Sequence, residues 1–459
     1  MVSAVPPSLT DVRRRQIVGR YIHELWTDGG SDLSGLAFPI FDGRLVALGR
    51  YVAFQDDDAD HAITRKESSP SIDRVQCEDM TYDTFIQTYM YPNRPVVIGG
   101  LAENWQAGQE WVQDVGEARI PNIAFLRAQF GSERAPVYEQ QTKGFGPTRP
   151  QASDSTIAEY CDWWTEQATL ASETVAVEKE STLYLKDWKF LAAHPKYNLY
   201  EWPHYFRDDW LNQAMGNAYK FVYLGPKGTS TVLHADVLQS FSWSTNVCGK
   251  KRWFLIPPEY TYLLYDCFGK KLASHLHADV DDGMKTFFPG LQEARRHAVR
   301  VDQEAGETIF VPSKWYHTVE NLEDTLSINH NWLNGANIGH SWDRLCIELA
   351  EVRPSRLDAG MGSEEIKSTE EICCGNSQIG DDLVLLWHVV TRKVLAVRNI
   401  IGASLSNQTI SDIDAILPVL LGMQKLLFEG RAPELLQFTE FEIDEHIQYF
   451  ESLQHLRRI

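Results

Sequence analysis

The sequence is poor in cysteine, and the cysteines it has follow no regular spacing. Seven are spread over 459 residues, only Cys373 and Cys374 lie close together, and no pair has the C-x₂-C spacing. This distribution argues against a disulfide framework and against a structural zinc site. A sparse, odd set of cysteines is typical of a reducing compartment. We therefore expect the protein in the cytoplasm, the nucleus or both, and not secreted.

Long apolar runs are also missing. Residues 1–18 lack the apolar stretch of a secretory signal peptide. The most apolar later segment, 383–401, is interrupted by His388, Arg392, Lys393 and Arg398. Because a membrane-spanning helix needs about 20 mostly apolar residues, we expect no membrane contact.

Positive charge is in deficit. The chain has 43 lysines and arginines against 63 aspartates and glutamates, which gives a formal net charge of −20. Such a field repels nucleic acid and attracts basic peptide segments, so we expect no direct nucleic-acid partner. The same charge also serves plain solubility, and that explanation precedes any partner inferred from charge alone. Apolar residues still make up 43% of the chain, enough to bury a sizeable core.

The chain divides into three parts by its residue pattern. Residues 1–71 contain a predicted helix at 10–27 and an acidic, polar linker that begins near 55. A second unit spans 72–340, and short runs rich in β-branched and aromatic residues dominate it from about 180 to 335. This predicts an all-β sandwich, jelly roll or barrel. From 341 to 459 the apolar spacing predicts helices, one of them with Ser411 as its N-cap.

Two of the β-rich segments contain the residue types of a metal site. His234 and Asp236 are two positions apart in the segment 228–237, so in a strand their side chains share one face. His317 lies in the second segment, 306–319. Two histidines and a carboxylate on neighbouring strands can occupy one face of an octahedron and leave three positions open. This is the ligand arrangement of iron(II) oxygenases.

A second His-x-Asp triplet, formed by His277 and Asp279, offers an alternative. Such triplets arise by chance, and either one taken alone is more often a surface feature than a metal site. The first triplet follows a glycine turn and precedes predicted strands, whereas the second lies in the polar, acidic part of the insertion 259–285. We therefore favour a solvated loop for His277 and Asp279.

A lysine at the start of a strand suits an anionic cosubstrate, because a buried carboxylate needs a cation. Lys251 stands at such a turn-to-strand junction, whereas its neighbour Lys250 is expected at the surface. Asn329 and Asn331 occupy alternate positions of a later strand and form a polar face. That face suits either solvent or a ligand-holding barrel lumen, and its proximity to His317 favours the lumen.

The ordered set of motifs resembles the jumonji-C (JmjC) oxygenase family. The resemblance runs from about 72 to 340, well over half of the chain. It is carried by RPVVI at 94–98, the Thr231 to Asp236 segment, GKKRW at 249–253 and FVPSxWxH at 310–317. Within the family, LYLKDW at 183–188, SFSWS at 240–244 and SINHNW at 327–332 are most similar to the jumonji-C domain-containing protein 4 group.

The resemblance implies a mainly β core, a double-stranded β-helix of the cupin or jelly-roll type, with flanking α-helices and a helical C-terminal region. It implies Fe(II) and 2-oxoglutarate as cofactors, with O₂ as a cosubstrate. The metal roles fall on His234, Asp236 and His317, and 2-oxoglutarate binding falls on Thr231, Lys251, Asn331 and Tyr223.

One tension and two departures accompany this assignment. Thr231 lies three residues before His234, so a regular strand would put them on opposite faces, and a bend after the glycine turn would reconcile them. Lys314 stands where glycine is usual, and Ser244 stands where several relatives have asparagine. Neither departure removes a metal ligand, but both bear on the cosubstrate contacts or the mouth of the site.

The resemblance leaves three functions open. The first is lysyl hydroxylation of a translation-termination release factor, the activity associated with that group, whose partner is a basic, lysine-containing segment. The second is N-methyl demethylation of lysine or arginine in a histone tail, as described for a plant relative. The third is a non-catalytic cupin that binds through its acidic surface and C-terminal helices. The intact His-Asp-His set argues against the third, and only the subgroup resemblance separates the first two.

Overall fold

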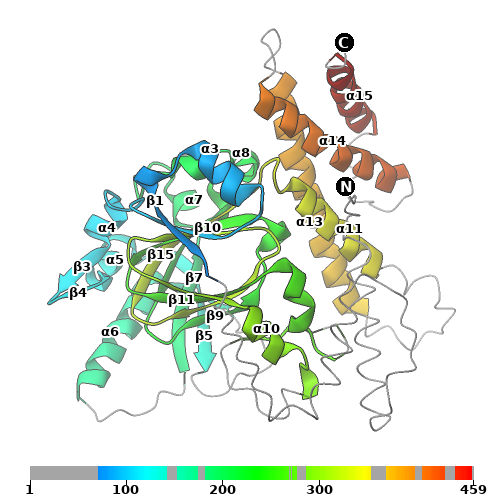
Figure 1. Ribbon diagram of the computed structural model, residues 1–459. Helices are drawn as coiled ribbons and strands as arrows, with labels where there is room; N and C mark the ends of the chain where they lie inside the picture. The colour runs from blue at the N-terminus through cyan, green and yellow to red at the C-terminus, as the bar shows by residue number, and fades with distance from the viewer. Residues whose placement is uncertain are drawn as a thin grey trace, which may run out of the picture.

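Two facing β-sheets form the centre of the molecule, and helices cover them (Figure 1). The computed structural model describes residues 71–141, 152–173, 181–267, 269, 271–276, 286–352, 369–398, 406–428 and 440–456. The predicted helix at 10–27, the linker near 55 and the second His-x-Asp triplet lie outside these residues. The prediction of a mainly β jelly-roll core with flanking helices and a helical C-terminal region is confirmed.

The larger sheet has nine strands in the order β1-β2-β13-β10-β15-β8-β7-β5-β6. Strands that are distant in sequence are neighbours in it, as in the pairing of β10 with both β13 and β15. In this order, the strands are Asp73–Gln76, Val96–Gly99, Thr308–Val311, Phe241–Cys248, Thr325–Trp332, Lys220–Gly225, Ser181–Trp188, Arg134–Gln141 and Ala152–Thr156.

The smaller sheet has four antiparallel strands in the order β12-β11-β14-β9. They are Val299–Gln303, Lys251–Ile256, Tyr316–Asn321 and Ser230–His234. A separate hairpin joins β3 (Val112–Val115) to β4 (Ala118–Pro121).

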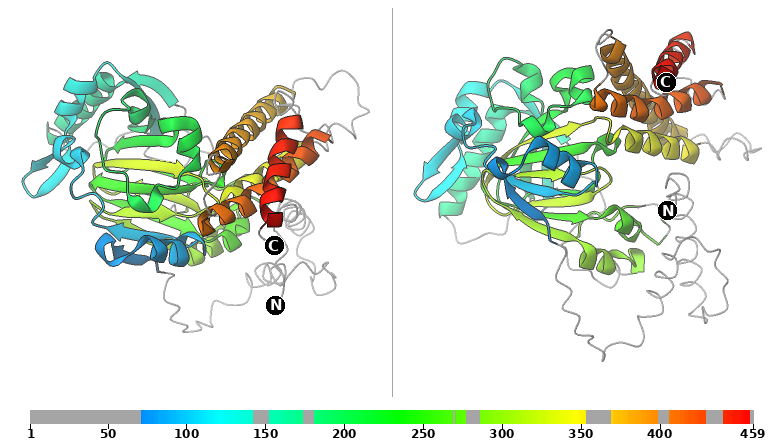
Figure 2. Two further views of the ribbon diagram at one scale, coloured as in Figure 1. Left: turned by 90° about the horizontal axis from the view of Figure 1, so that it is seen from above. Right: turned by 45° about the horizontal axis from the view of Figure 1, so that its top comes forward.

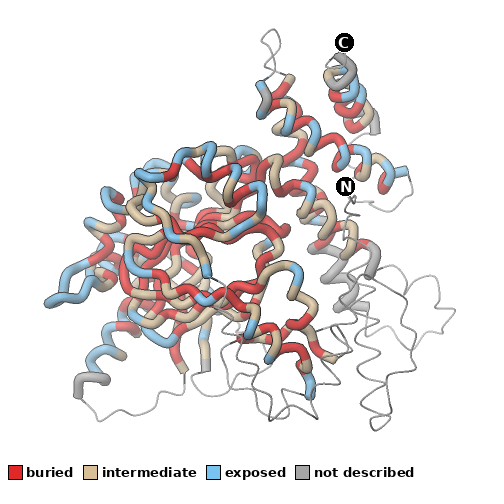
Figure 3. The backbone as a smooth tube through the Cα atoms, in the orientation of Figure 1, coloured by how far each residue is buried: buried red, intermediate tan, exposed pale blue. Residues whose placement is uncertain are grey.

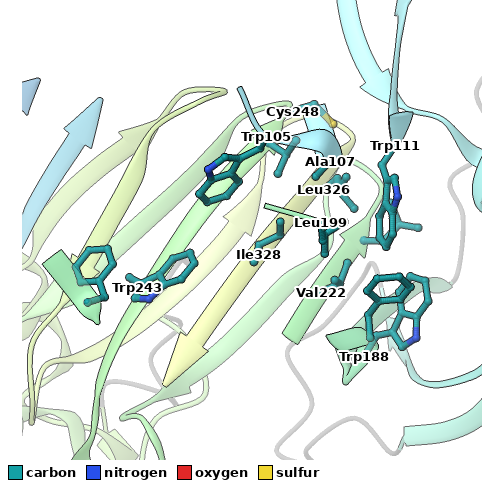
Figure 4. Close-up of a cluster of buried hydrophobic side chains, with 14 of the residues drawn as sticks. Trp105, Ala107, Trp111, Trp188, Leu199, Val222, Trp243, Cys248, Leu326 and Ile328 are labelled. Carbon is teal, nitrogen blue, oxygen red and sulfur yellow. The ribbon is translucent and has the colours of Figure 1, made fainter. Parts of the chain in front are cut away.

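Period-two alternation decides which side chains enter the space between the sheets. In β15, Leu326 and Ile328 face a large aromatic cluster on the outer side of the larger sheet, together with Val222 of β8 (Figure 4). Their neighbours Ser327 and Asn329 therefore point to the opposite face, between the sheets. The polar face predicted for this strand is thus turned inward.

Five helices that precede β8 in the chain cover the outer face of the larger sheet and supply much of that aromatic cluster. They are α3 (Tyr82–Phe85), α4 (Gln106–Glu110), α5 (Ile123–Phe130), α6 (Ile157–Glu173) and α7 (Phe190–Ala193). On the outer side of the smaller sheet, the 3₁₀ segment η7 (Pro258–Leu264) and α10 (Leu291–His297) form another apolar cluster with Leu233 and Ile256.

The C-terminal helices lie together on one side of the barrel (Figures 1 and 2). They are α11 (Ile338–Val352), α13 (Thr369–Arg398), α14 (Asn407–Phe428) and α15 (Glu440–Leu456). Buried and exposed positions alternate along them (Figure 3), and their buried faces form one cluster with α8 (Trp210–Met215). No helix in the described ranges is both long and apolar enough to cross a bilayer.

The predicted N-cap at Ser411 is wrong. The helix begins at Asn407, and the Ser406 hydroxyl accepts a hydrogen bond from the Thr409 backbone N–H at 3.1 Å. Ser406 therefore satisfies one of the free amides of the first turn, whereas Ser411 lies inside the helix.

Candidate metal and cosubstrate site

The three predicted metal ligands lie together between the sheets. His234 ends β9 and is directly opposite His317 of β14, with 4.3 Å between the ring centroids. Asp236 follows two residues after β9. One ligand atom from each of these side chains lies within 4.8 Å of the others. Across the described residues, this is the single group of histidine, cysteine and carboxylate side chains with metal-binding spacing.

Backbone carbonyls orient both imidazoles. Nδ1 of His234 lies 2.8 Å from the Val232 carbonyl oxygen, and Nδ1 of His317 lies 3.0 Å from that of Trp315. A carbonyl only accepts, so each Nδ1 carries the hydrogen and each Nε2 keeps a free lone pair. Burial, with the neighbouring His317, lowers the pKa of His234 to about 3. The imidazole of His234 is therefore neutral at physiological pH, as a metal ligand must be.

Two neutral donors fix the carboxylate of Asp236. The Ser242 hydroxyl donates to Oδ2 at 2.7 Å, and the Asn331 side-chain amide donates to Oδ1 at 2.9 Å. The same amide nitrogen also lies 3.1 Å from the Ser240 hydroxyl. Asn331, predicted as a cosubstrate residue, therefore orients a metal ligand in this structure. Both donors come from the larger sheet, so they tie Asp236 across the barrel.

A β-bulge resolves the position of Thr231. His234 pairs with His317, and Thr231 pairs with Val319. Three residue-to-residue steps along β9 therefore match two steps along β14. His317 and Val319 share a face because they are two apart, and directly paired residues lie on the same side of a sheet. Thr231 therefore points to the same face as His234. The irregularity that brings the two residues to one face is thus a bulge inside β9, which follows the glycine turn at Gly228.

Lys251 extends into the space between the sheets from the first residue of β11. It is 2% exposed, and its ammonium donates to the Ser327 hydroxyl at 2.8 Å. Burial lowers the pKa of Lys251 to about 7, an effect that Lys186 increases. Lys250, the neighbouring residue, instead pairs with Glu304 at 2.5 Å on the outer side. The two lysines thus have the different environments that the sequence predicted.

Tyr223 contacts the same region but is engaged with an aspartate. Its hydroxyl donates to Asp187 at 2.8 Å, and the Tyr138 hydroxyl donates to the other carboxylate oxygen at 3.1 Å. Asp187 adopts a φ of 59°, a conformation that costs a residue other than glycine about 1 kcal/mol or more. A bulge in β7 accompanies this conformation: Leu185 pairs with Leu224 and Trp188 pairs with Val222, so β7 has one more residue than β8 between the two pairs.

Two residues of the site were missed in the sequence. Tyr184 is fully buried, and its ring centroid lies 6.2 Å from that of Tyr223. Lys186 places its ammonium 4.6 Å from the Tyr138 ring centroid and 5.6 Å from that of Tyr184. Burial lowers the pKa of Lys186. Both residues belong to a predicted strand, where their two-residue spacing was a usable signal.

Unsatisfied polar atoms mark the space between the sheets. Ser244 and Asn329 are directly opposite each other in the β10–β15 pair. Their Oγ and Oδ1 atoms are buried and have no hydrogen-bond partner among the described residues. Buried polar atoms without partners are rare in proteins, so this region is suited to a polar ligand.

Lys314, which stands where glycine is usual, has a φ of 67°. Glycine adopts this left-handed conformation without steric cost, which accounts for its frequent occurrence at this position in the family. The lysine retains it while its ammonium lies 3.7 Å from the Asp343 carboxylate on α11. The turn that precedes His317 is therefore linked to the C-terminal helices.

A family model described as the cupin-like domain matches residues 82–337. The chain is 39% identical over 306 residues to the "Arginine-specific demethylase JMJ20" of Arabidopsis thaliana, which covers 62% of each chain. It is 38% identical over 293 residues to "2-oxoglutarate and iron-dependent oxygenase JMJD4" of Danio rerio, covering 62% of this chain and 66% of that one. The human protein of that name is 34% identical over 288 residues, covering 60% and 64%. The matches thus span just under two thirds of the length of these relatives.

Proposed function

Because the chain belongs to the JmjC branch of the cupin-like domain family, we propose that it is a 2-oxoglutarate-dependent dioxygenase that uses Fe(II) to oxidise a protein side chain. The observation that carries this proposal is the convergence of His234, Asp236 and His317 within 4.8 Å. Two imidazoles and one carboxylate with open positions are the ligand set of non-haem iron(II) oxygenases.

The donor set fits a divalent metal. Each imidazole directs an Nε2 lone pair inward, because its Nδ1 is tied to a backbone carbonyl. Asp236 supplies the negative charge, and its two hydrogen bonds restrict the rotation of the carboxylate. Such outer partners typically contribute about 10- to 100-fold to metal affinity. His234, Asp236 and His317 are therefore the residues that would hold iron.

The surroundings also fit a dicarboxylate. Lys251 is a buried ammonium that donates to the neutral hydroxyl of Ser327, so an anion beside it would replace part of the hydration it has lost. Thr231 and Tyr184 present hydroxyls on the same side of the site. We assign 2-oxoglutarate binding to Lys251 and Thr231, with Tyr223 and Asn331 contributing to the walls. Tyr184 joins them because it is buried beside the ring of Tyr223.

When bound, iron and 2-oxoglutarate supply the reductive activation of O₂ that attack on an unactivated C–H bond requires. The chain's own residues bind the cosubstrate, orient the substrate and exclude water. Trp253 contributes to the last task, since its ring lies 5.6 Å from that of His317 and is 5% exposed.

The proposed substrate is a lysine in a basic segment of a translation-termination release factor. Two facts support it: the motif resemblance to the jumonji-C domain-containing protein 4 group, and the net charge of −20, which favours a basic partner. N-methyl demethylation of a histone tail is the second candidate. It is supported by the 39% identity to a plant relative named an arginine-specific demethylase. Both outcomes use the same site.

Mass spectrometry of peptides incubated with the full chain, Fe(II), ascorbate and 2-oxoglutarate separates the candidates. A release-factor peptide that gains one oxygen at lysine supports hydroxylation, and a methylated histone peptide that loses a methyl group supports demethylation. The Asp236→Ala variant is the control, because it retains the fold's sheets but lacks the charged ligand. Wild-type protein that decarboxylates 2-oxoglutarate with neither peptide modified would reject both substrates but not the cofactor assignment. Absence of any 2-oxoglutarate turnover would favour the non-catalytic cupin.

A further inference from the structure

The turn that follows Asp236 has an unusual backbone. Val237–Gln239 forms the 3₁₀ segment η6, in which Leu238 has a φ of 53° and Gln239 a φ of 52°. Two consecutive left-handed residues, neither of them glycine, are strained because each Cβ crowds the backbone. Such conformations persist where the surrounding structure holds them in place, and they cluster at functional sites.

Packing against the C-terminal part of the chain holds this turn. Leu238 is 7% exposed and belongs to the cluster formed by α8, Leu333 just after β15, and the C-terminal helices. The turn contacts α11, whose Ile338 and Leu345 are fully buried members of that cluster. Val237, by contrast, is 54% exposed. Leu238 is thus the side chain by which the turn is anchored.

The other end of the turn is the metal ligand itself. The Gln239 N–H donates to the Asp236 carbonyl at 3.0 Å, and the Ser240 N–H donates to the Val237 carbonyl at 2.9 Å. Asn331 bonds both the Asp236 carboxylate and the Ser240 hydroxyl, so it closes the turn from the barrel side. A displacement of Leu238 therefore moves the backbone that carries Asp236.

We propose that Leu238 is a positioning residue for the metal ligand Asp236, and that the C-terminal helices, by burying Leu238, form a working part of the metal site. The proposal rests on the proposed function only in requiring that the His-Asp-His group binds a divalent metal. It gives the helical region a role in cofactor affinity that is separate from any role in binding a partner.

The test compares the affinity of three full-chain variants for Mn(II), a metal of iron-like coordination that is stable in air. Leu238→Ala removes the anchor, and Leu238→Met keeps an apolar side chain of similar volume. Leu420→Ala is the matched control: it removes the same atoms from the same cluster, but from α14, where Leu420 is fully buried. Electron paramagnetic resonance of free Mn(II) gives the affinity, and thermal unfolding gives Tm.

We expect Leu238→Ala to weaken Mn(II) binding about 10- to 100-fold, the range for losing an outer-shell constraint. Leu238→Met is expected to bind as the wild type does. Leu420→Ala is expected to lose Tm and retain affinity. If Leu238→Ala lowers only Tm, as the control does, Leu238 is merely a core residue and the proposal fails. If Leu238→Ala does not fold, Leu238→Gly takes its place with the same criteria, because glycine removes the anchor and adopts a φ near 53° without strain. Failure of the wild type to bind Mn(II) would instead refute the metal site itself.

Discussion

Replacing Lys251 by methionine tests the cosubstrate assignment most directly. Lys251 is 2% exposed, and its ammonium is bonded to the neutral hydroxyl of Ser327. Methionine fills a similar volume without charge, so the barrel interior stays packed. We expect the variant to lose affinity for 2-oxoglutarate while its fold becomes more stable. These two effects have opposite signs, which is unusual for a core substitution.

The magnitudes follow from the burial of the ammonium. Leaving a buried carboxylate without its charge partner costs roughly 3–5 kcal/mol, and 1.4 kcal/mol is tenfold in affinity. The expected loss is therefore about 100-fold or more. Burial lowers the pKa of Lys251 from its ordinary value of 10.5 to about 7. Near neutral pH the buried lysine therefore lowers the free energy of unfolding by up to about 4 kcal/mol, and the methionine variant does not bear this cost.

Isothermal titration of 2-oxoglutarate with Mn(II) present measures the affinity, and thermal unfolding without ligand measures the stability. Lys250→Met is the matched control, because Lys250 pairs with Glu304 on the outer side of the strand. We expect it to change neither quantity much. Equal losses of affinity in the two variants, or unchanged binding by Lys251→Met, would refute the assignment.

Three further outcomes are expected. His234→Ala abolishes Mn(II) binding and His277→Ala does not, because only the first belongs to the His-Asp-His group; metal titration checks both. The affinity for 2-oxoglutarate falls as pH rises from about 7 towards 9, since the pKa of the buried lysine is about 7 and only its ammonium pairs with a carboxylate; calorimetry across this range should show proton uptake on binding. Substrate association weakens with salt if the acidic insertion steers a basic segment, an effect that a triple asparagine variant should reproduce without changing uncoupled 2-oxoglutarate decay. The substituted residues are Asp279, Asp281 and Asp282.

Strand periodicity accounts for the parts of the site that the sequence predicted. A two-residue spacing places His234 and Asp236 on one side, and the same rule turns Asn329 and Asn331 inward together. The contrast between Lys251 and Lys250 follows from the same alternation. These predictions needed only the local conformation, which the β-rich composition indicates.

The sequence did not reveal features that depend on register between distant segments. The bulge in β9 that turns Thr231 inward is visible only against its partner β14. The bond of Asn331 to Asp236 joins residues 95 positions apart, so its effect on a metal ligand has no local signature. The left-handed turn at Leu238 and Gln239 contains no glycine, so the sequence does not indicate it. Its cause is the packing of helices that begin 100 residues later in the chain, at Ile338.

The division of the site between the two sheets explains why these long-range features matter. His234, His317 and Lys251 come from the smaller sheet, and Asp236 follows its strand β9. Across the barrel, Lys251 donates to Ser327 and Asp236 accepts from Asn331, and both of these partners belong to the larger sheet. An apolar cluster between the sheets sets their separation. Its members include Val97, Ile309 and Val311 of the larger sheet and Trp253, Leu255 and Val319 of the smaller sheet. Because packed interiors resist small displacements, this cluster keeps the ammonium and the metal ligands at fixed distances from their partners across the barrel. The apolar cluster at one end of the barrel therefore maintains the geometry of the polar site at the other end. Neither sheet alone contains a complete site.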